Sequence, residues 1–181
     1  MCRYHFVVIL RSENPTDLDS IRLLVDQAFG EPMPSKLIDL VRGSDRFVPD
    51  LSIVAETDGV LLGHILLSYV TIEGEESFDV LSLAPLAVHP DHQRRGVGTA
   101  LSEEGLARAE RQGVPLVVVE GHPGYYPRFG FERASLHGIE KAAPQVPDDA
   151  FMVRRLSSYE PRFRGQLVYP PAFYDADTVG S

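Results

Sequence analysis

The segment 87–101, AVHPDHQRRGVGTAL, constrains the fold of this chain more than any other stretch. An apolar run over 77–90 leads into it, and a helix is predicted from about residue 96 to residue 112. A second apolar run, 114–121, follows directly and is typical of a buried strand. Glycines and arginines therefore stand at a junction between a strand and a helix, and the rest of the sequence must account for them.

The chemistry of a helix N-terminus accounts for these residue types. The first turn of a helix leaves backbone N–H groups unpaired, and the helix dipole adds partial positive charge. A pyrophosphate fits such a site, because Gly96 and Gly98 allow close approach and Arg94 and Arg95 add charge. Taken alone, the fragment also fits a surface turn with two solvated arginines. A classical P-loop is excluded because its Gly-Lys-Ser/Thr is missing, and a dinucleotide-binding loop would need a third glycine.

The first third of the chain is predicted to hold a strand and two helices. A β-branched run at 5–13 predicts the strand. Apolar residues at helical spacing predict a helix within 14–30, with Thr16 and Asp19 as its capping pair and Gly30 as its end. A second, shorter helix is predicted over 35–44.

The middle of the chain changes to the period of β-strands. The runs 51–57 and 60–72 flank an Asp-Gly pair, which predicts a hairpin with a tight turn. The strand over 77–90 contains Pro85, so a bulge is expected there.

The rest of the chain is predicted to complete one domain over 1–181. A helical turn and a strand are expected within 122–135, a late strand at 150–156, and a strand with an extension over 165–173. The alternation of strands and helices predicts a mixed α/β domain.

Composition excludes several classes of function. The chain has 181 residues, of which 44% are hydrophobic and 24% charged, as in soluble globular proteins. A net charge of −9 argues against nucleic-acid binding and favours a cationic partner. No run approaches the ~20 apolar residues of a membrane span. The single cysteine, Cys2, forms no intrachain disulfide and is interpreted as an incidental thiol, so a cytoplasmic location is expected.

The segments PLAVHPDHQRRGVGTAL and YYPRFGF together resemble the acetyl-coenzyme A signature of the GNAT superfamily of N-acetyltransferases. Its pattern Gln/Arg-x-x-Gly-x-Gly/Ala is matched by Gln93, Gly96 and Gly98. A bacterial subgroup with GYYxRFGF and VxYPxAF is the nearest in character, matched here by 124–131 and 168–173.

The resemblance implies a GNAT fold, which is a mixed, mostly antiparallel twisted sheet that splays between its fourth and fifth strands and is flanked by helices. Residues 1–76 would form the acceptor side, 77–135 the acetyl-CoA side, and 136–181 the C-terminal strands and tail.

The resemblance also implies how acetyl-CoA, the cosubstrate, would bind. The pantetheine arm would bond to main-chain groups of Leu86 and Val88, and an N–H near Leu86 would polarise the thioester carbonyl. The expected cofactor-binding residues are Leu86, Ala87, Val88, Gln93, Arg94, Arg95, Gly96, Val97, Gly98, Thr99 and Ala100. No metal is expected, because His89 and His92 fit a turn better than a closed metal site.

Three residues are candidates for catalysis. Tyr126 stands where the family has its general acid, which protonates the departing thiolate; the alternatives are that it only packs, or that Tyr125 is the acid. Some members place a basic carboxylate on the fourth strand, but the matching residue here is Ser82. Glu120 and His122 are the nearest substitutes, and a water chain is the alternative.

The expected activity is direct acetyl transfer from acetyl-CoA to a primary amine, on a small molecule or a peptide, because no residue offers a convincing nucleophile. Two alternatives remain open: a non-catalytic acyl-CoA sensor or interaction module with the same fold, and an unrelated phosphate-binding α/β enzyme. The segment LVYPPAF is interpreted as a lid over the acceptor, a sheet-edge element or part of a homodimer.

Overall fold

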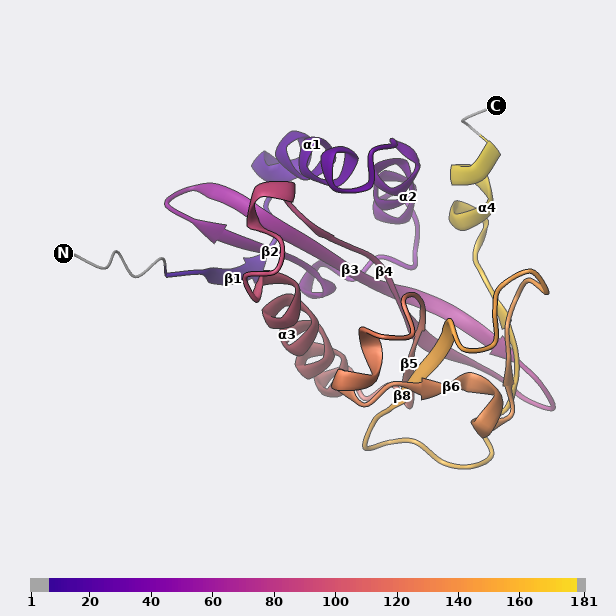
Figure 1. Cartoon of the computed structure of the whole chain (residues 1–181). Helices are drawn as coiled ribbons and strands as arrows, with labels where there is room; N and C mark the ends of the chain where they lie inside the picture. The colour runs from indigo at the N-terminus through magenta and orange to yellow at the C-terminus, as the bar shows by residue number, and fades with distance from the viewer. Residues whose placement is uncertain (1–6, 179–181) are drawn as a thin grey trace.

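A nine-stranded sheet organises the chain (Figure 1). The computed structural model describes residues 7–178, so Cys2 and the start of the predicted first strand lie outside the described residues. The strands are β1 (Ile9–Ser12), β2 (Ser52–Thr57), β3 (Val60–Glu73), β4 (Ser77–Val88), β5 (Leu116–Glu120), β6 (Glu132–Arg133), β7 (Ile139–Glu140), β8 (Phe151–Arg155) and β9 (Gly165–Val168). Their order is β1-β2-β3-β4-β5-β8-β6, with β9 pairing both β3 and β7. The sheet is mostly antiparallel, with parallel pairs at β4–β5 and β7–β9, as the resemblance implied.

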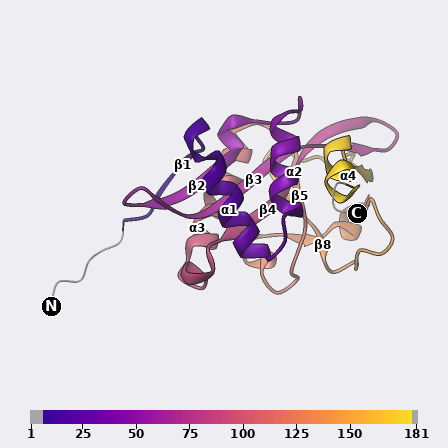
Figure 2. The same cartoon turned by 90° about the horizontal axis from the view of Figure 1, so that it is seen from above.

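Within residues 7–178, four α-helices cover the two faces of the sheet. They are α1 (Leu18–Phe29), α2 (Met33–Arg42), α3 (Val97–Arg111) and α4 (Pro171–Thr178). Figure 1 shows α1 and α2 over one face and α3 over the other. Seen from above in Figure 2, α4 lies beside α2, and the two helices are in contact. No helix among residues 7–178 is long and apolar enough to cross a membrane.

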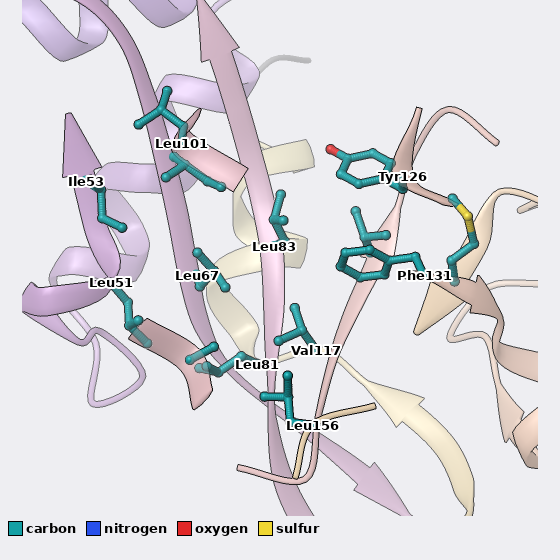
Figure 3. Close-up of a cluster of buried hydrophobic side chains, with 14 of the residues drawn as sticks. Leu51, Ile53, Leu67, Leu81, Leu83, Leu101, Val117, Tyr126, Phe131 and Leu156 are labelled. Atoms are coloured by element: carbon teal, nitrogen blue, oxygen red, sulfur yellow. The ribbon is translucent and has the colours of Figure 1, made fainter. Parts of the chain in front are cut away.

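Alternating side chains on the strands build a core on each face. On β2, Ile53 and Ala55 pack into the core that α3 covers, whereas Val54 packs into the core under α1 and α2. Figure 3 shows the α3-side core, which reaches across β4 and β5 to Tyr126 and Phe131. A third core lies under the C-terminal strands.

The strand β4 contains the bulge that Pro85 predicted. Ile65 on β3 faces Leu86, and Leu67 faces Leu83, so a single β3 residue stands opposite Ala84 and Pro85. The peptide bond between Ala84 and Pro85 is cis.

The strands β4 and β5 separate soon after they meet. Their parallel pairing consists of Leu81 with Val117 and Ser82 with Val118, and it ends there although both strands continue. The expected splay between the fourth and fifth strands is therefore confirmed. Backbone groups beyond this point are left without a sheet partner and face a gap.

The C-terminal segment adds an unpredicted helix to the predicted strand. β9 pairs with residues 71–73 of β3, which places the end of the chain along the sheet. The helix α4 then begins at Pro171 and packs beside α2. Leu167 and Val168 of LVYPPAF belong to β9, which has β3 on one side and β7 on the other, and the residues from Pro171 onward are helical rather than an irregular extension.

Candidate active site

A cavity of about 730 Å³ opens where β4 and β5 part. Its walls come from the bulged part of β4, from the end of β5 and the turn after it, from α1 and α2, and from the segment 169–174. The size is in the range typical of ligand sites. The separation of β4 and β5 thus opens a cavity, and elements from several parts of the chain form its remaining walls.

Main-chain groups of β4 face this gap. The N–H of His89 donates to the carbonyl of Leu62 on β3 at 2.8 Å, which fixes one bonded pair of the antiparallel ladder. Bonded and non-bonded pairs alternate, so Leu86 and Val88 turn their N–H and C=O groups away from β3. The carbonyl of Val88 accepts a hydrogen bond from Gln93 Nε2 at 3.2 Å. The predicted residue Gln93 therefore contacts the strand that leads into the loop.

The N-terminus of α3 presents free donors close to this strand. Ala100 makes the first intrahelical bond, to the carbonyl of Gly96, so the amides of residues 97–99 have no partner within the helix. Gly96 caps the helix with φ of 87°, a conformation that favours glycine. A Cβ on Gly98 would lie 3.0 Å from Tyr125 Oη, so only glycine fits there without a shift.

The two arginines before the helix add uncompensated positive charge. Arg94 and Arg95 are exposed, and neither forms an ion pair with any residue from 7 to 178. The first turn of α3 carries no acidic side chain. The residues predicted to bind an anion therefore form a positive surface with unpaired donors, and the chemistry of such a surface suits a pyrophosphate.

Tyr126 belongs to the core and also to the cavity. Its side chain is 8% exposed, and its ring packs edge-on against Tyr125 and Phe131 at centroid distances of 5.1 and 5.5 Å. In Figure 3 its phenol oxygen points from the β5 side towards β4. Burial, with a further contribution from Tyr125, raises the pKa of Tyr126 to about 12. Tyr126 can therefore pack in the core with its ring and still face the cavity with its hydroxyl.

Tyr125 occupies a different place from its neighbour. Its hydroxyl approaches Gly98 at the start of α3, and Arg128 stacks on its ring at 4.6 Å from the centroid. The Arg128 side chain also donates to the Tyr125 carbonyl at 2.9 Å. Tyr125 therefore lies against the helix N-terminus.

Glu120 projects towards the opposite face of the sheet from α3. Along β5, Val117 and Val119 pack on the α3 side, and Val118 packs in the C-terminal core, so Glu120 follows Val118. Its carboxylate accepts a hydrogen bond of 2.9 Å from Tyr169 Oη.

Tyr169 is a residue of the site that the sequence did not identify as functional. Burial, together with the charge of Glu120, raises the pKa of Tyr169 well above its usual range, with Ser82 opposing the rise. The phenol therefore stays protonated and holds the Glu120 carboxylate in place.

His122 is already engaged by its own loop. Its Nδ1 accepts the N–H of Gly124 at 3.1 Å, which places the proton of a neutral ring on Nε2. Ser82 is buried at the base of the cavity. Of the two candidate bases, Glu120 is the one with an oxygen that no hydrogen bond within residues 7–178 occupies.

The histidines near the loop form a turn, as predicted. Residues 90–92 make one turn of 3₁₀ helix, and His89 Nδ1 accepts the N–H of Asp91 at 3.2 Å. The described part of the chain contains no group of three or more side chains placed to hold a metal ion.

Comparison with known proteins identifies the family. The family model described as an acetyltransferase (GNAT) domain matches residues 10–134. The chain belongs to the GNAT acetyltransferase family. It is 35% identical over 171 residues to the uncharacterized N-acetyltransferase YjhQ of Escherichia coli K12, which covers 92% of this chain and 93% of the relative. The predicted family and enzyme class are thereby confirmed.

Solved GNAT structures share the whole architecture. YhbS of Escherichia coli, in complex with CoA, has a TM-score of 0.85 at 29% identity, over 96% of each chain. A GNAT acetyltransferase of Brucella melitensis, in complex with acetyl-CoA, has a TM-score of 0.76 at 30% identity, over 93% of this chain and 99% of that one. The GNAT family match ends at residue 134, before the segment that carries Tyr169.

Proposed function

We propose that this GNAT enzyme transfers the acetyl group of acetyl-CoA to a primary amine by direct attack in the gap between β4 and β5. The observation that carries the proposal is the composition of the two walls of that gap. Main-chain donors of β4 stand on one side, and Tyr126 and Glu120 stand on the other. Residues 77–135 would bind acetyl-CoA, and residues 1–76 and 136–181 would build the acceptor side.

The thioester would be held mainly by backbone donors. The N–H of Leu86, which faces away from β3, would polarise the acetyl carbonyl, and the amides of residues 97–99 with Arg94 and Arg95 would bind the pyrophosphate. The missing side chain at Gly96 leaves open space beside these amides, because nothing lies within 4 Å of the position that its Cβ would take. The complexes of the two structural neighbours with CoA and acetyl-CoA support this assignment.

Glu120 would remove the proton that keeps the amine from attacking. An alkylammonium has a pKa of about 10.4, so it is charged at neutral pH. After Glu120 takes one proton, the amine nitrogen bonds to the acetyl carbon, the C–S bond breaks, and a second proton leaves the nitrogen. One of these two protons ends on the CoA sulfur and the other is released to water, which balances the reaction.

Tyr126 would stabilise the departing thiolate with a hydrogen bond. Its pKa of about 12 lies well above the ~8.5 of an ordinary thiol, so complete proton transfer from the phenol to sulfur is uphill. A hydrogen bond from the neutral phenol to the developing negative charge requires no such transfer. Tyr126 is therefore a donor to the thiolate, and the amine is the source of the proton.

Release of CoA thiol over a panel of primary amines tests this function. We expect turnover with at least one amine and a large loss in Tyr126→Phe. Calorimetry with acetyl-CoA alone should give the same affinity for both proteins. Acetyl-CoA binding without turnover of any amine would instead support a sensor, and no binding of acetyl-CoA at millimolar concentration would overturn the proposal.

A further inference from the structure

We infer that the acceptor is a primary amine carried on a flat apolar group, of the arylalkylamine class, with its ammonium at Glu120 and its ring beside Tyr169 and Phe173. The inference rests on the proposed function and names the substrate class of the same site. It depends on three features of the cavity: its charge, its exposed aromatic side chains and the way Glu120 is held.

The charge of the cavity suits a molecule with one positive group. Among the described residues that line it, Glu120 is the only carboxylate, and there is no lysine or arginine. A polyamine would leave its second ammonium without a counter-charge, and the carboxylate of a free amino acid would meet no cation. A single carboxylate in a lining without lysine or arginine therefore favours a molecule with one ammonium and no carboxylate, which is a monoamine.

The acceptor side of the cavity is aromatic. Tyr169 and Phe173 stack with their ring centroids 4.6 Å apart and their planes 19° from parallel, and both line the cavity. Phe29 and Tyr174, which also line it, are 45% and 54% exposed. Large apolar side chains exposed together around a cavity indicate a surface that a ligand covers. A flat ring would bury them and stack favourably against them.

Polar groups that could read a peptide are scarce in the same wall. Besides Glu120, the polar side chains of the lining are Ser82, His122, Gln145 and the tyrosines, whereas α1 and α2 contribute Phe29, Met33 and Leu37. A peptide would bury backbone N–H and C=O groups here without enough hydrogen-bond partners, and each unpaired buried group would weaken binding. The lining thus favours a small apolar body over a protein lysine.

The contact between Tyr169 and Glu120 sets the position of the ammonium. Oε1 of Glu120 accepts the Tyr169 hydroxyl at 2.9 Å, and this leaves the second oxygen for the amine. The same tyrosine contributes its ring to the stack with Phe173. Tyr169 therefore fixes both the carboxylate that would bind the ammonium and the aromatic surface that would contact the ring. The enzyme should for this reason select amines by the distance between their ammonium and their ring.

The test compares kcat/KM for 2-phenylethylamine, propylamine, spermidine and a lysine-containing peptide. We expect 2-phenylethylamine to exceed each of the others by tenfold or more. Glu120→Gln should lower kcat/KM for 2-phenylethylamine at least tenfold, whereas Glu75→Gln, which removes an equal charge from an exposed turn, should not change it. Phe173→Leu should reduce the preference for 2-phenylethylamine over propylamine while the protein keeps its melting temperature within a few degrees.

The outcomes separate this inference from the proposed function. A preference for spermidine or the peptide would overturn the inference and leave acetyl transfer intact. If no amine is acetylated, calorimetry of 2-phenylethylamine with the enzyme–CoA complex decides. If the enzyme–CoA complex binds 2-phenylethylamine and the Glu120→Gln variant does not, the inference is supported and the proposed function is overturned. If the enzyme–CoA complex does not bind 2-phenylethylamine, the inference is overturned.

Discussion

Tyr126 shows at the scale of one residue how burial changes the pKa of a group that we propose takes part in catalysis. Because burial raises its pKa to about 12, the phenol stays neutral throughout the physiological range and loses its proton only near pH 12. We expect kcat to show no decline from phenol ionisation between pH 7 and pH 10. A pH–rate profile at saturating amine checks this, and a falling limb near pH 9 that disappears in Tyr126→Phe would contradict it.

The hydroxyl of Tyr126 should matter more than that of its neighbour. We expect Tyr126→Phe to lower kcat by about 10- to 100-fold, since a donor to developing charge is lost. Tyr125→Phe is the matched control, because its hydroxyl lies against Gly98 rather than in the gap. Steady-state kinetics of the two variants show which hydroxyl contributes more to kcat. A larger fall in kcat in Tyr125→Phe than in Tyr126→Phe would make Tyr125 the donor to the thiolate.

Single residues of the site differ in how well the sequence revealed them. Gly96, Gly98 and Tyr126 lie in short motifs, so their neighbours in sequence are also their neighbours in space. Tyr169 was out of reach because its partner Glu120 is 49 positions away, and only the pairing of β9 with β3 brings the two together. Local sequence patterns do not predict a contact between residues so far apart in the chain.

At the scale of an element, the N-terminus of α3 offers a clean test of anion binding. Gly96 and Gly113 both have positive φ, 87° and 73°, and an added Cβ would meet nothing within 4 Å at either. Alanine at each position should therefore cost a similar strain, about 1–2 kcal/mol. We expect Gly96→Ala to weaken acetyl-CoA about tenfold by displacing the free amides, as measured by calorimetry.

Gly113→Ala is the control because it strains the opposite end of the same helix. It should lower the free energy of unfolding by an amount similar to that in Gly96→Ala and leave acetyl-CoA affinity unchanged. Equal weakening of acetyl-CoA in both variants would mean that helix stability, rather than the free amides, governs binding.

Elements were predictable where local chemistry decides them. The Asp58-Gly59 turn has positive φ at both residues, 49° and 78°, as the hairpin prediction required. The start of α1 was predicted wrongly: a 3₁₀ turn over Pro15–Asp17 precedes the helix, and its capping pair is Asn14 and Asp17, with the Asp17 carboxylate accepting the N–H of Asn14 at 2.7 Å. The sequence DLD offers competing carboxylates, and Asp17 is the one that also meets Arg11.

The helix α4 was missed for a different reason. It is 8 residues long, begins at the second proline of a Pro-Pro pair, and its buried residues pack in the core under α2 and in the C-terminal core. Helices this short depend on tertiary packing more than on propensity. Its sequence alone therefore gave no helical signal.

At the scale of the whole molecule, a buried polar cluster joins the N-terminal segment, α2 and the sheet. Glu13, 8% exposed, pairs with Arg42 at 2.6 Å, accepts the hydroxyl of Ser52 at 2.5 Å and lies 3.5 Å from His64. Burial alone would raise the pKa of Glu13, but the hydrogen bonds from His64, Arg42 and Ser52 outweigh it and hold the pKa at about 2. Burial lowers the pKa of His64.

Both shifts make stability fall with acidification. A depressed carboxyl pKa stabilises the fold above the unfolded value, here 4.5, and this contribution is lost as pH falls towards 2. His64, with its lowered pKa, likewise binds its proton more weakly in the folded protein, so stability begins to fall below about pH 6.5. Urea unfolding between pH 7 and pH 3 should show this decline.

Removal of the Glu13 charge should flatten that dependence. We expect Glu13→Gln to cost about 3 kcal/mol at pH 7, because Arg42 loses a buried partner, and to show a weaker decline below pH 5. Glu31→Gln, at an exposed position, is the control and should leave both quantities unchanged. An unaltered slope in Glu13→Gln would place the acid sensitivity elsewhere.

The docking of β9 on residues 71–73 of β3 separates two tasks in the chain. The residues proposed to bind the thioester lie within 10–134, the stretch that the family model matches, whereas the stacked pair Tyr169 and Phe173 beside Glu120 is positioned by the separate pairing of β9 with β3. Replacing residues 165–174 with the matching ten residues of another family member should therefore change the amine preference of the enzyme. The affinity for coenzyme A should stay the same. In this fold, the exchange of one short segment can therefore change the acceptor amine without altering the residues that carry the acetyl transfer.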